Sequence, residues 1–151
     1  MSKLWGPGFI FIILLAFTGC ARLTVSKPAG FAESRDRGLY RAVSPEGLLY
    51  KVHLVKNYPE QELEFWGRAL KNHLTREGYY FTGREESFRA GDRPGILYEW
   101  GLPYGNEDYI YLTAIVVFDK KIAVAEAAGV HTVFRQYRQA LLDSIKSIAC
   151  R

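Results

Sequence analysis

The sequence is short of the residues from which catalytic and metal sites are usually built. Its 151 residues include two cysteines and three histidines, and no two of the histidines have the close spacing of a zinc-ligand pair. It contains no Gly-x-Ser-x-Gly nucleophile elbow and no glycine-rich phosphate loop. We therefore expect a protein that is not an enzyme and holds no metal or cofactor, with structural roles for His53, His73 and His131.

Long apolar runs, internal repeats and a strong excess of charge are also missing. The apolar stretch 9–17 is shorter than the roughly 20 residues needed to span a bilayer. A formal net charge of +4 is too small to indicate a nucleic-acid partner. With 48% hydrophobic and 15% aromatic residues, the chain has the composition of one folded domain, which we expect over residues 38–151.

The N-terminus has the pattern of an export signal. Lys3 precedes the apolar stretch 9–17, and Thr18 and Gly19 lead directly to Cys20. The segment resembles the signal of bacterial lipoproteins, although Phe17 stands where that family usually has leucine. The resemblance implies a signal peptide over residues 1–19 and palmitate-type acyl chains on Cys20. The alternatives are an ordinary cleaved signal and an uncleaved anchor, with Cys20 incidental in both.

Lipidation of Cys20 would set the location of the protein and the state of its second cysteine. It implies an anchored domain that faces the periplasm, and Ala21, in place of the aspartate that often marks inner-membrane retention, favours the outer membrane. Residues 20–37 would then be the lipidated cysteine and a tether. Cys150 would be a free thiol or part of an intermolecular disulfide, whereas a Cys20–Cys150 bridge requires that Cys20 is not lipidated.

The remaining chain predicts two helices and a sheet. Apolar residues recur at helical spacing between Pro59 and Gly78 and again over residues 132–149. Strand alternation is found over residues 48–55, 79–89, 95–101, 109–118 and 122–128. Strand 109–118 is apolar on both faces and should be central. Several connections are too short for parallel crossovers, so we expect an α+β fold with a mainly antiparallel sheet of about six strands covered by two main α-helices.

Three segments together resemble a known fold family. They are Ser44–Tyr50, the helical stretch Glu62–Trp66, and Ala125–Gly129 leading into Phe134–Tyr137. This pattern resembles the PsbP/Mog-type α/β/α sandwich, which the bacterial DcrB-like lipoproteins also have. The resemblance implies a domain that docks onto partner proteins, and it transfers no functional residue to this chain.

One group of aromatic and acidic residues is a candidate surface for a partner or ligand. If the strands around residues 100 and 109 pair as a hairpin, these side chains gather near one end of the sheet. The candidate residues are Tyr98, Trp100, Tyr104, Glu107, Asp108 and Tyr109. The alternative is that the rings belong to the core and the acids to a solvated loop.

Three functions remain open at this point. The favoured one is a lipid-anchored periplasmic domain without catalytic activity that binds or stabilises an envelope protein complex, with Trp100 and Tyr104 accessible to solvent. The second is a lipoprotein that binds a small ligand, an ion or a glycan. The third is a hydrolase, which would need paired carboxylates at a defined separation in a cleft.

Overall fold

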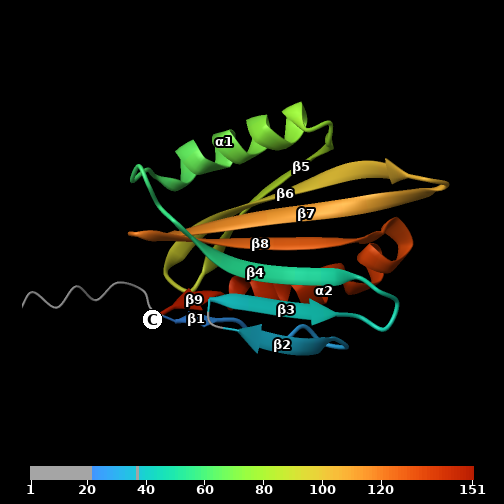
Figure 1. Cartoon of the computed structure of the whole chain (residues 1–151), viewed down its shortest axis with the longest axis horizontal. Coiled ribbons are helices and arrows are strands. Elements are labelled where there is room, and N and C mark those ends of the chain that lie inside the picture. The colour runs from blue at the N-terminus through green and yellow to red at the C-terminus, as the bar shows by residue number, and fades with distance from the viewer. Residues whose placement is uncertain (1–21, 37) are drawn as a thin grey trace, which may run out of the picture.

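The protein is built around a seven-stranded antiparallel sheet, with a two-stranded sheet beside it (Figure 1). The computed structural model describes residues 22–36 and 38–151. The large sheet has the strand order β2-β3-β4-β8-β7-β6-β5. Its strands are β2 (Ala32–Asp36), β3 (Leu39–Val43), β4 (Leu49–Lys56), β5 (Tyr80–Ala90), β6 (Arg93–Tyr104), β7 (Glu107–Phe118) and β8 (Lys121–Val130). The expected fold class is confirmed, with one strand more than the sequence predicted.

Helix α1 (Leu63–Arg76) lies within the predicted range and ends two residues before Gly78, the predicted stop. Gly78 follows the helix with a φ of +89°, in the left-handed region that glycine adopts without strain. The apolar face of α1 covers β6 and β7 and closes a small cluster around Leu74, Tyr98 and Trp100. The position of α1 therefore determines which rings of the hairpin are buried.

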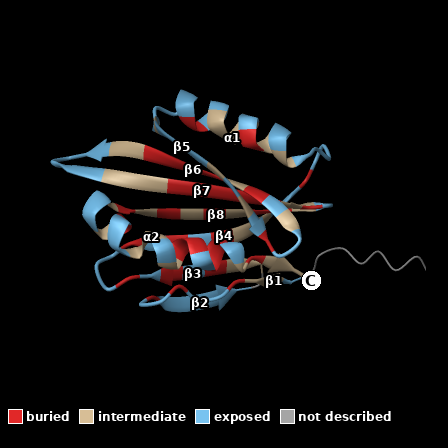
Figure 2. Cartoon of the chain, turned by 180° about the vertical axis from the view of Figure 1, so that it is seen from behind, coloured by how far each residue is buried: buried red, intermediate tan, exposed pale blue. Residues whose placement is uncertain are grey.

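Helix α2 (His131–Lys146) covers the opposite face of the sheet, as Figure 2 shows from behind. Ala123, Ala125 and Ala127 on β8 belong to the main core together with Phe134 and Leu141 of the helix. These small side chains let α2 approach the strand closely. Strand β7 contacts both helices, so the prediction of a central strand covered on both sides is confirmed.

The predicted tether is wrong for residues 22–36, which are part of the folded domain. Strand β1 (Leu23–Thr24) pairs with β9 (Ala149–Cys150), and Val25 and Phe31 are buried in the main core. The backbone N–H of Ser26 donates a hydrogen bond of 2.8 Å to the side-chain oxygen of Ser147, which fixes this segment at the end of α2. The segment has the polar, glycine-containing composition of a linker. Its pairing with residues 149 and 150 is a long-range contact that composition does not show.

The C-terminal end of α2 is the second departure from expectation. The helical spacing continues to Ala149, but the helix ends at Lys146 and the chain turns into β9. Ile148 remains buried in the main core. Ile148 thus fits the apolar pattern because it is a core residue, although it lies between α2 and β9 and not in the helix.

Candidate functional site

The predicted hairpin forms, but two of its rings are inside the domain. Strands β6 and β7 pair with Trp100 opposite Tyr111 and Tyr104 opposite Glu107. Tyr98 is 2% exposed and Trp100 is fully buried, because α1 lies over this face of the hairpin. The indole N–H of Trp100 donates to the hydroxyl of Thr113 at 3.0 Å, so the buried ring is satisfied. Tyr98 and Trp100 therefore cannot be part of a contact surface.

The other four predicted residues lie at the tip of the hairpin, away from the helices. Tyr104 is 71% exposed and contacts the ring of Tyr109 edge to face, with 5.8 Å between the ring centres. Glu107 and Asp108 are exposed beside them. Binding by this tip remains a prediction.

Of the two cysteines, only Cys150 lies among the described residues. Cys20 lies outside the described residues, so its lipidation also remains a prediction. Cys150 is half-buried in β9 and is not a free thiol.

The two faces of the large sheet are covered unequally, and the difference creates a groove. Figure 1 shows α1 over the β5–β6 side, with no described helix in front of β8, β4 and β3. The uncovered half holds a cavity of about 560 Å³. Its lining comes from β2, β3, β4 and β8, with Tyr111 of β7 at the inner border. We call this cavity the sheet groove.

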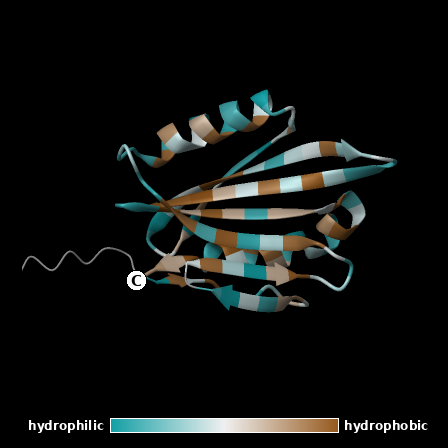
Figure 3. Ribbon diagram, viewed as in Figure 1, coloured by the Kyte–Doolittle hydropathy of each residue, from teal (hydrophilic) through white to brown (hydrophobic). Residues whose placement is uncertain are grey.

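An apolar row crosses the floor of the sheet groove. Val43 lies directly opposite Leu49, and Leu49 lies directly opposite Ala128. Leu49 is 61% exposed and Val43 is 39% exposed, and they form the pair next to the turn that joins β3 to β4. Figure 3 shows these strands alternating between hydrophobic and hydrophilic residues. Apolar side chains on an uncovered sheet face mark a surface that can bury a partner or ligand.

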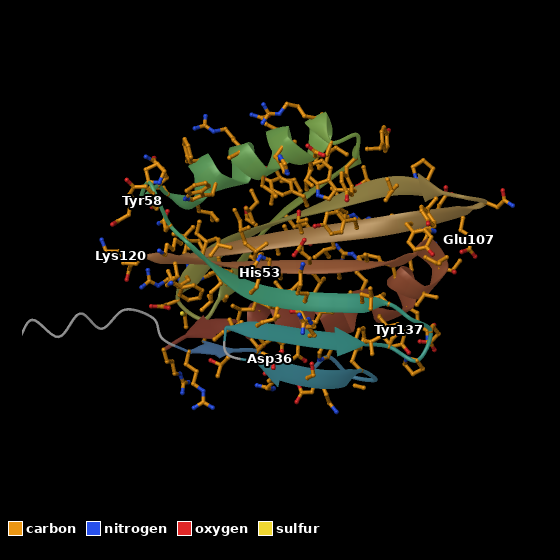
Figure 4. All side chains as sticks on the ribbon, viewed as in Figure 1. Asp36, His53, Tyr58, Glu107, Lys120 and Tyr137 are labelled. Atoms are coloured by element: carbon orange, nitrogen blue, oxygen red, sulfur yellow. The ribbon has the colours of Figure 1, made fainter. Side chains whose placement is uncertain are left out.

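A polar cluster lies next to the apolar row. Glu126 accepts a hydrogen bond from the hydroxyl of Tyr111 at 2.5 Å and forms an ion pair with the Lys51 ammonium at 2.7 Å. Nδ1 of His53 is 3.6 Å from the same carboxylate and has no hydrogen-bond partner among the described residues. Figure 4 places His53 on the uncovered side of β4. The half-buried carboxylate of Glu126 on β8 thus organises three side chains from the two neighbouring strands, β4 and β7.

The ionisation of this cluster follows from burial and from its contacts. Burial raises the pKa of Glu126, but the hydrogen bonds and charge of Lys51 and the hydrogen bond from Tyr111 outweigh it, so the pKa is lowered overall. Burial lowers the pKa of His53, and the charge of Glu126 offsets this only in part. At neutral pH the site therefore combines a carboxylate, an ammonium and a neutral imidazole.

A second charged contact joins α2 to the sheet. Arg138 donates from Nε to Glu99 and from Nη2 to Glu86, each at 2.6 Å. The side chain of Glu99 is 8% exposed, and Arg84 approaches it at 3.6 Å. Arg84, Glu99 and Arg138 border a polar cavity of about 490 Å³. Because Arg138 is already paired with two carboxylates, we assign this contact to packing of α2.

Sequence reasoning missed the sheet groove, although two signals for it are present. Glu126 interrupts an otherwise apolar strand, and Leu49 shares a face with Lys51 and His53. Each is an exception to its own strand pattern. Their proximity depends on the β4–β8 pairing, which joins residues more than seventy positions apart. His73 is exposed on α1 and His131 is exposed at the start of α2, and their structural roles remain predictions.

Comparisons with known proteins identify the fold. No family model and no curated protein sequence matches the chain. Among solved structures, it superposes on LpqN of Mycobacterium tuberculosis with a TM-score of 0.67 and 12% identity, covering 90% of this chain and 87% of LpqN. It superposes on cyanobacterial PsbP (CyanoP) of Synechocystis with a TM-score of 0.59 and 8% identity, covering 89% of this chain and 96% of that one.

A third structure shows the same fold within a larger protein. The chain superposes on a protein of Bacteroides thetaiotaomicron with a TM-score of 0.55 and 10% identity, covering 86% of this chain. It spans 45% of the length of that protein. The chain is an α+β domain with the PsbP-type fold that its sequence resembles. In the part of the chain that the structure describes, neither helix is both long and apolar enough to cross a bilayer.

Proposed function

We propose that the protein is a lipid-anchored, non-catalytic domain of the bacterial cell envelope that binds another envelope protein in the sheet groove. The observation that carries this proposal is the opposed pair Val43 and Leu49, which is exposed on an uncovered sheet face. Burying an exposed leucine side chain contributes about 1.5–3 kcal/mol, so an isolated domain gains nothing from this arrangement and a complex does. The solved structure of LpqN, described as involved in cell envelope biogenesis, supports the location.

The chemistry of the groove specifies what the partner presents. The carboxylate of Glu126 is satisfied within the domain by Lys51 and Tyr111, so the polar cluster does not require a charged ligand. The apolar row requires an apolar side chain. Strand β2 borders the groove and is an edge strand among the described residues, so its outer backbone groups can pair with an extended segment. We therefore propose an extended segment with apolar side chains as the bound element of the partner.

The location follows from the N-terminal sequence. We propose that acylated Cys20 holds the domain in the membrane with its folded part in the periplasm. The residue after it, Ala21, favours the outer membrane.

A small amphiphilic molecule is the second candidate occupant of the groove. The cavity volume of about 560 Å³ lies within the range of roughly 300–1,000 Å³ that small-molecule sites occupy. Such a ligand would increase the melting temperature of the domain in a saturable way. Leu49→Lys would abolish that increase, because it places a charge on the apolar row.

Site-specific photo-crosslinking in intact cells tests the protein-binding function. A photoreactive residue replaces Leu49 in the full chain, and matched variants carry it at Tyr104, in the predicted hairpin tip, or at Tyr80. Tyr80 is exposed on the other face of the sheet. We expect one protein adduct from position 49 and none from position 80. An adduct from position 104 and none from position 49 would show that the partner binds the hairpin tip and not the sheet groove. The absence of an adduct from both position 49 and position 104 would refute protein binding by both surfaces.

A further inference from the structure

One end of the domain gathers cationic side chains from five separate elements. The segments that meet there are the end of β4, the start of β8, the end of α2 and the paired ends of β1 and β9. Figure 1 places the C-terminus and the β7–β8 turn at this same end of the molecule. The cations contributed by these segments are Arg22, Lys56, Lys121, Lys146 and Arg151. We call this surface the basic end.

Most cations at the basic end differ from their neighbours in having no close acidic partner among the described residues. Two further cations at this end have partners, since Arg93 pairs with Asp119 at 3.1 Å and Lys120 pairs with Glu60. None of the five forms an ion pair with a described residue. Lys56 and Lys121 lie directly opposite each other on β4 and β8, an arrangement of like charges that destabilises a sheet. An external anion at the basic end would relieve this repulsion.

An exposed aromatic ring accompanies the positive charge. Tyr58, in the loop between β4 and α1, is 82% exposed. Figure 4 shows Tyr58 and Lys120 projecting at the same end of the molecule. Tyrosine is enriched at membrane–water interfaces because its ring is apolar and its hydroxyl is polar. The combination of lysine, arginine and tyrosine fits a phospholipid headgroup layer.

The chain between Cys20 and the first described residue of the domain is too short to hold the basic end far from the membrane. Arg22 and Arg151 exchange two backbone hydrogen bonds, of 2.8 and 3.0 Å, so the domain is already folded at residue 22. Cys20 precedes Arg22 by two residues, and an extended residue spans at most about 3.6 Å. Arg22 therefore lies within about 7 Å of an acylated Cys20. This step rests on the lipid anchor of the proposed function.

We propose that the basic end is a second membrane-binding surface that contacts anionic phospholipid headgroups. Cationic side chains near an anionic bilayer strengthen attachment and fix the orientation of the domain. Leu49 and Lys56 lie at opposite ends of β4. With about 3.3 Å per residue, seven steps separate the sheet groove from the basic end by about 23 Å. The groove is thereby held clear of the membrane.

Vesicle binding by the unacylated chain tests this proposal independently of the anchor. Cys20→Ser is expressed behind a conventional cleavable signal, and its folding is verified by thermal unfolding. Binding is measured by co-sedimentation with vesicles of phosphatidylglycerol and phosphatidylethanolamine, and with vesicles of phosphatidylcholine. Lys121→Glu/Lys146→Glu reverses charge at the basic end. The control is Arg76→Glu/Arg135→Glu, which reverses two charges at exposed positions outside the basic end. Arg76 lies in the last turn of α1 as Lys146 does in the last turn of α2, so each pair removes one cation from a helix C-terminus.

The expected result is binding to the anionic vesicles that weakens with salt and is absent with phosphatidylcholine. Charge reversal at the basic end should weaken binding by about tenfold or more, and the control pair should weaken it less. Equal loss in the two variants, or equal binding to both vesicle types, would overturn the proposal. The photo-crosslink from position 49 tests partner binding in the sheet groove, and the vesicle assay tests membrane binding by the basic end. Failure of one proposal can therefore be distinguished from failure of the other.

Discussion

Gly67 of α1 lies against the phenol hydroxyl of Tyr98 so closely that a Cβ at residue 67 would be 2.8 Å from that oxygen. The helix therefore approaches β6 at the one position where it has no side chain. Tyr98 is buried, so its ring has little freedom to move aside. This contact helps to place α1 over the hairpin and leaves the other half of the sheet face uncovered.

Gly67→Ala should destabilise the domain by about 1 kcal/mol. Overpacking costs about 1–3 kcal/mol, and the better helix propensity of alanine offsets about 1 kcal/mol of it. Tyr98→Phe removes the obstructing oxygen, and the next contact, with Ile96, is an ordinary 3.4 Å. In that background Gly67→Ala should become neutral or stabilising. Urea unfolding of the four chains measures the change of sign, and equal effects in both backgrounds would contradict it.

Arg138→Met should destabilise the domain by about 2–3 kcal/mol, because it leaves the buried carboxylate of Glu99 without its guanidinium partner. Arg84→Met is the control. Arg84 is half exposed and lies 3.6 Å from Glu99, so its removal should cost less than about 1 kcal/mol. Glu99→Leu combined with Arg138→Met should recover part of the loss. Similar unfolding midpoints for the two arginine variants would contradict the assignment of Arg138 as the main partner.

The polar cluster predicts two separate losses of stability in acid. The pKa of His53 is lowered on folding, so the unfolded chain binds a proton first, and stability falls as the pH drops below about 6.5. The pKa of Glu126 is also lowered, so its contribution is present above 4.5 and is lost as the pH falls further. Unfolding free energies measured across this range should show both steps.

Single substitutions separate these two steps. His53→Gln should remove the change that begins near pH 6.5 and retain the more acidic one. Glu126→Gln should weaken the acidic step and lower stability at neutral pH, because Lys51 and Tyr111 lose their ionised acceptor. Tyr111→Phe serves as a control that removes one hydrogen bond without changing the charge. A profile of His53→Gln identical to that of the parent would show that His53 does not cause the first step.

Intact-protein and peptide mass spectrometry should find Cys20 at the N-terminus of the mature protein, carrying acyl chains. The acylated protein should partition into detergent, whereas Cys20→Ser should not. Digestion without reductant also identifies the group to which Cys150 is bonded. An unmodified Cys20 joined to Cys150, or a retained signal, would refute lipidation and remove the anchor from both proposals.

The sequence predicts the elements better than it predicts their contacts. Helix α1 and strands β4 to β8 are apparent from local spacing, because each has a strong apolar period and ends at a glycine, a proline or a turn. The sequence leaves open whether Trp100 belongs to a contact surface or to the core, because strand alternation shows that a ring lies on one face without showing what covers that face. The cover is α1, which lies more than twenty residues earlier in the chain.

The short first strand and the groove were not predictable for the same reason. The two residues of β1 have no periodicity of their own, and their partner β9 is at the other end of the chain. Leu49 and Glu126 appear in the sequence as exceptions to two separate strand patterns. Only the β4–β8 register brings them to one surface. The predictable features are local, and the candidate site depends on long-range pairing.

The pairing of β1 with β9 also makes completion of the domain depend on two segments that are synthesised far apart in time. Synthesis proceeds from the N-terminus, so Leu23 and Thr24 are made long before their partners Cys150 and Ala149. The segment around β1 therefore cannot form this pairing until residue 150 is available. We expect Val25 and Phe31 to be among the last residues to enter the main core.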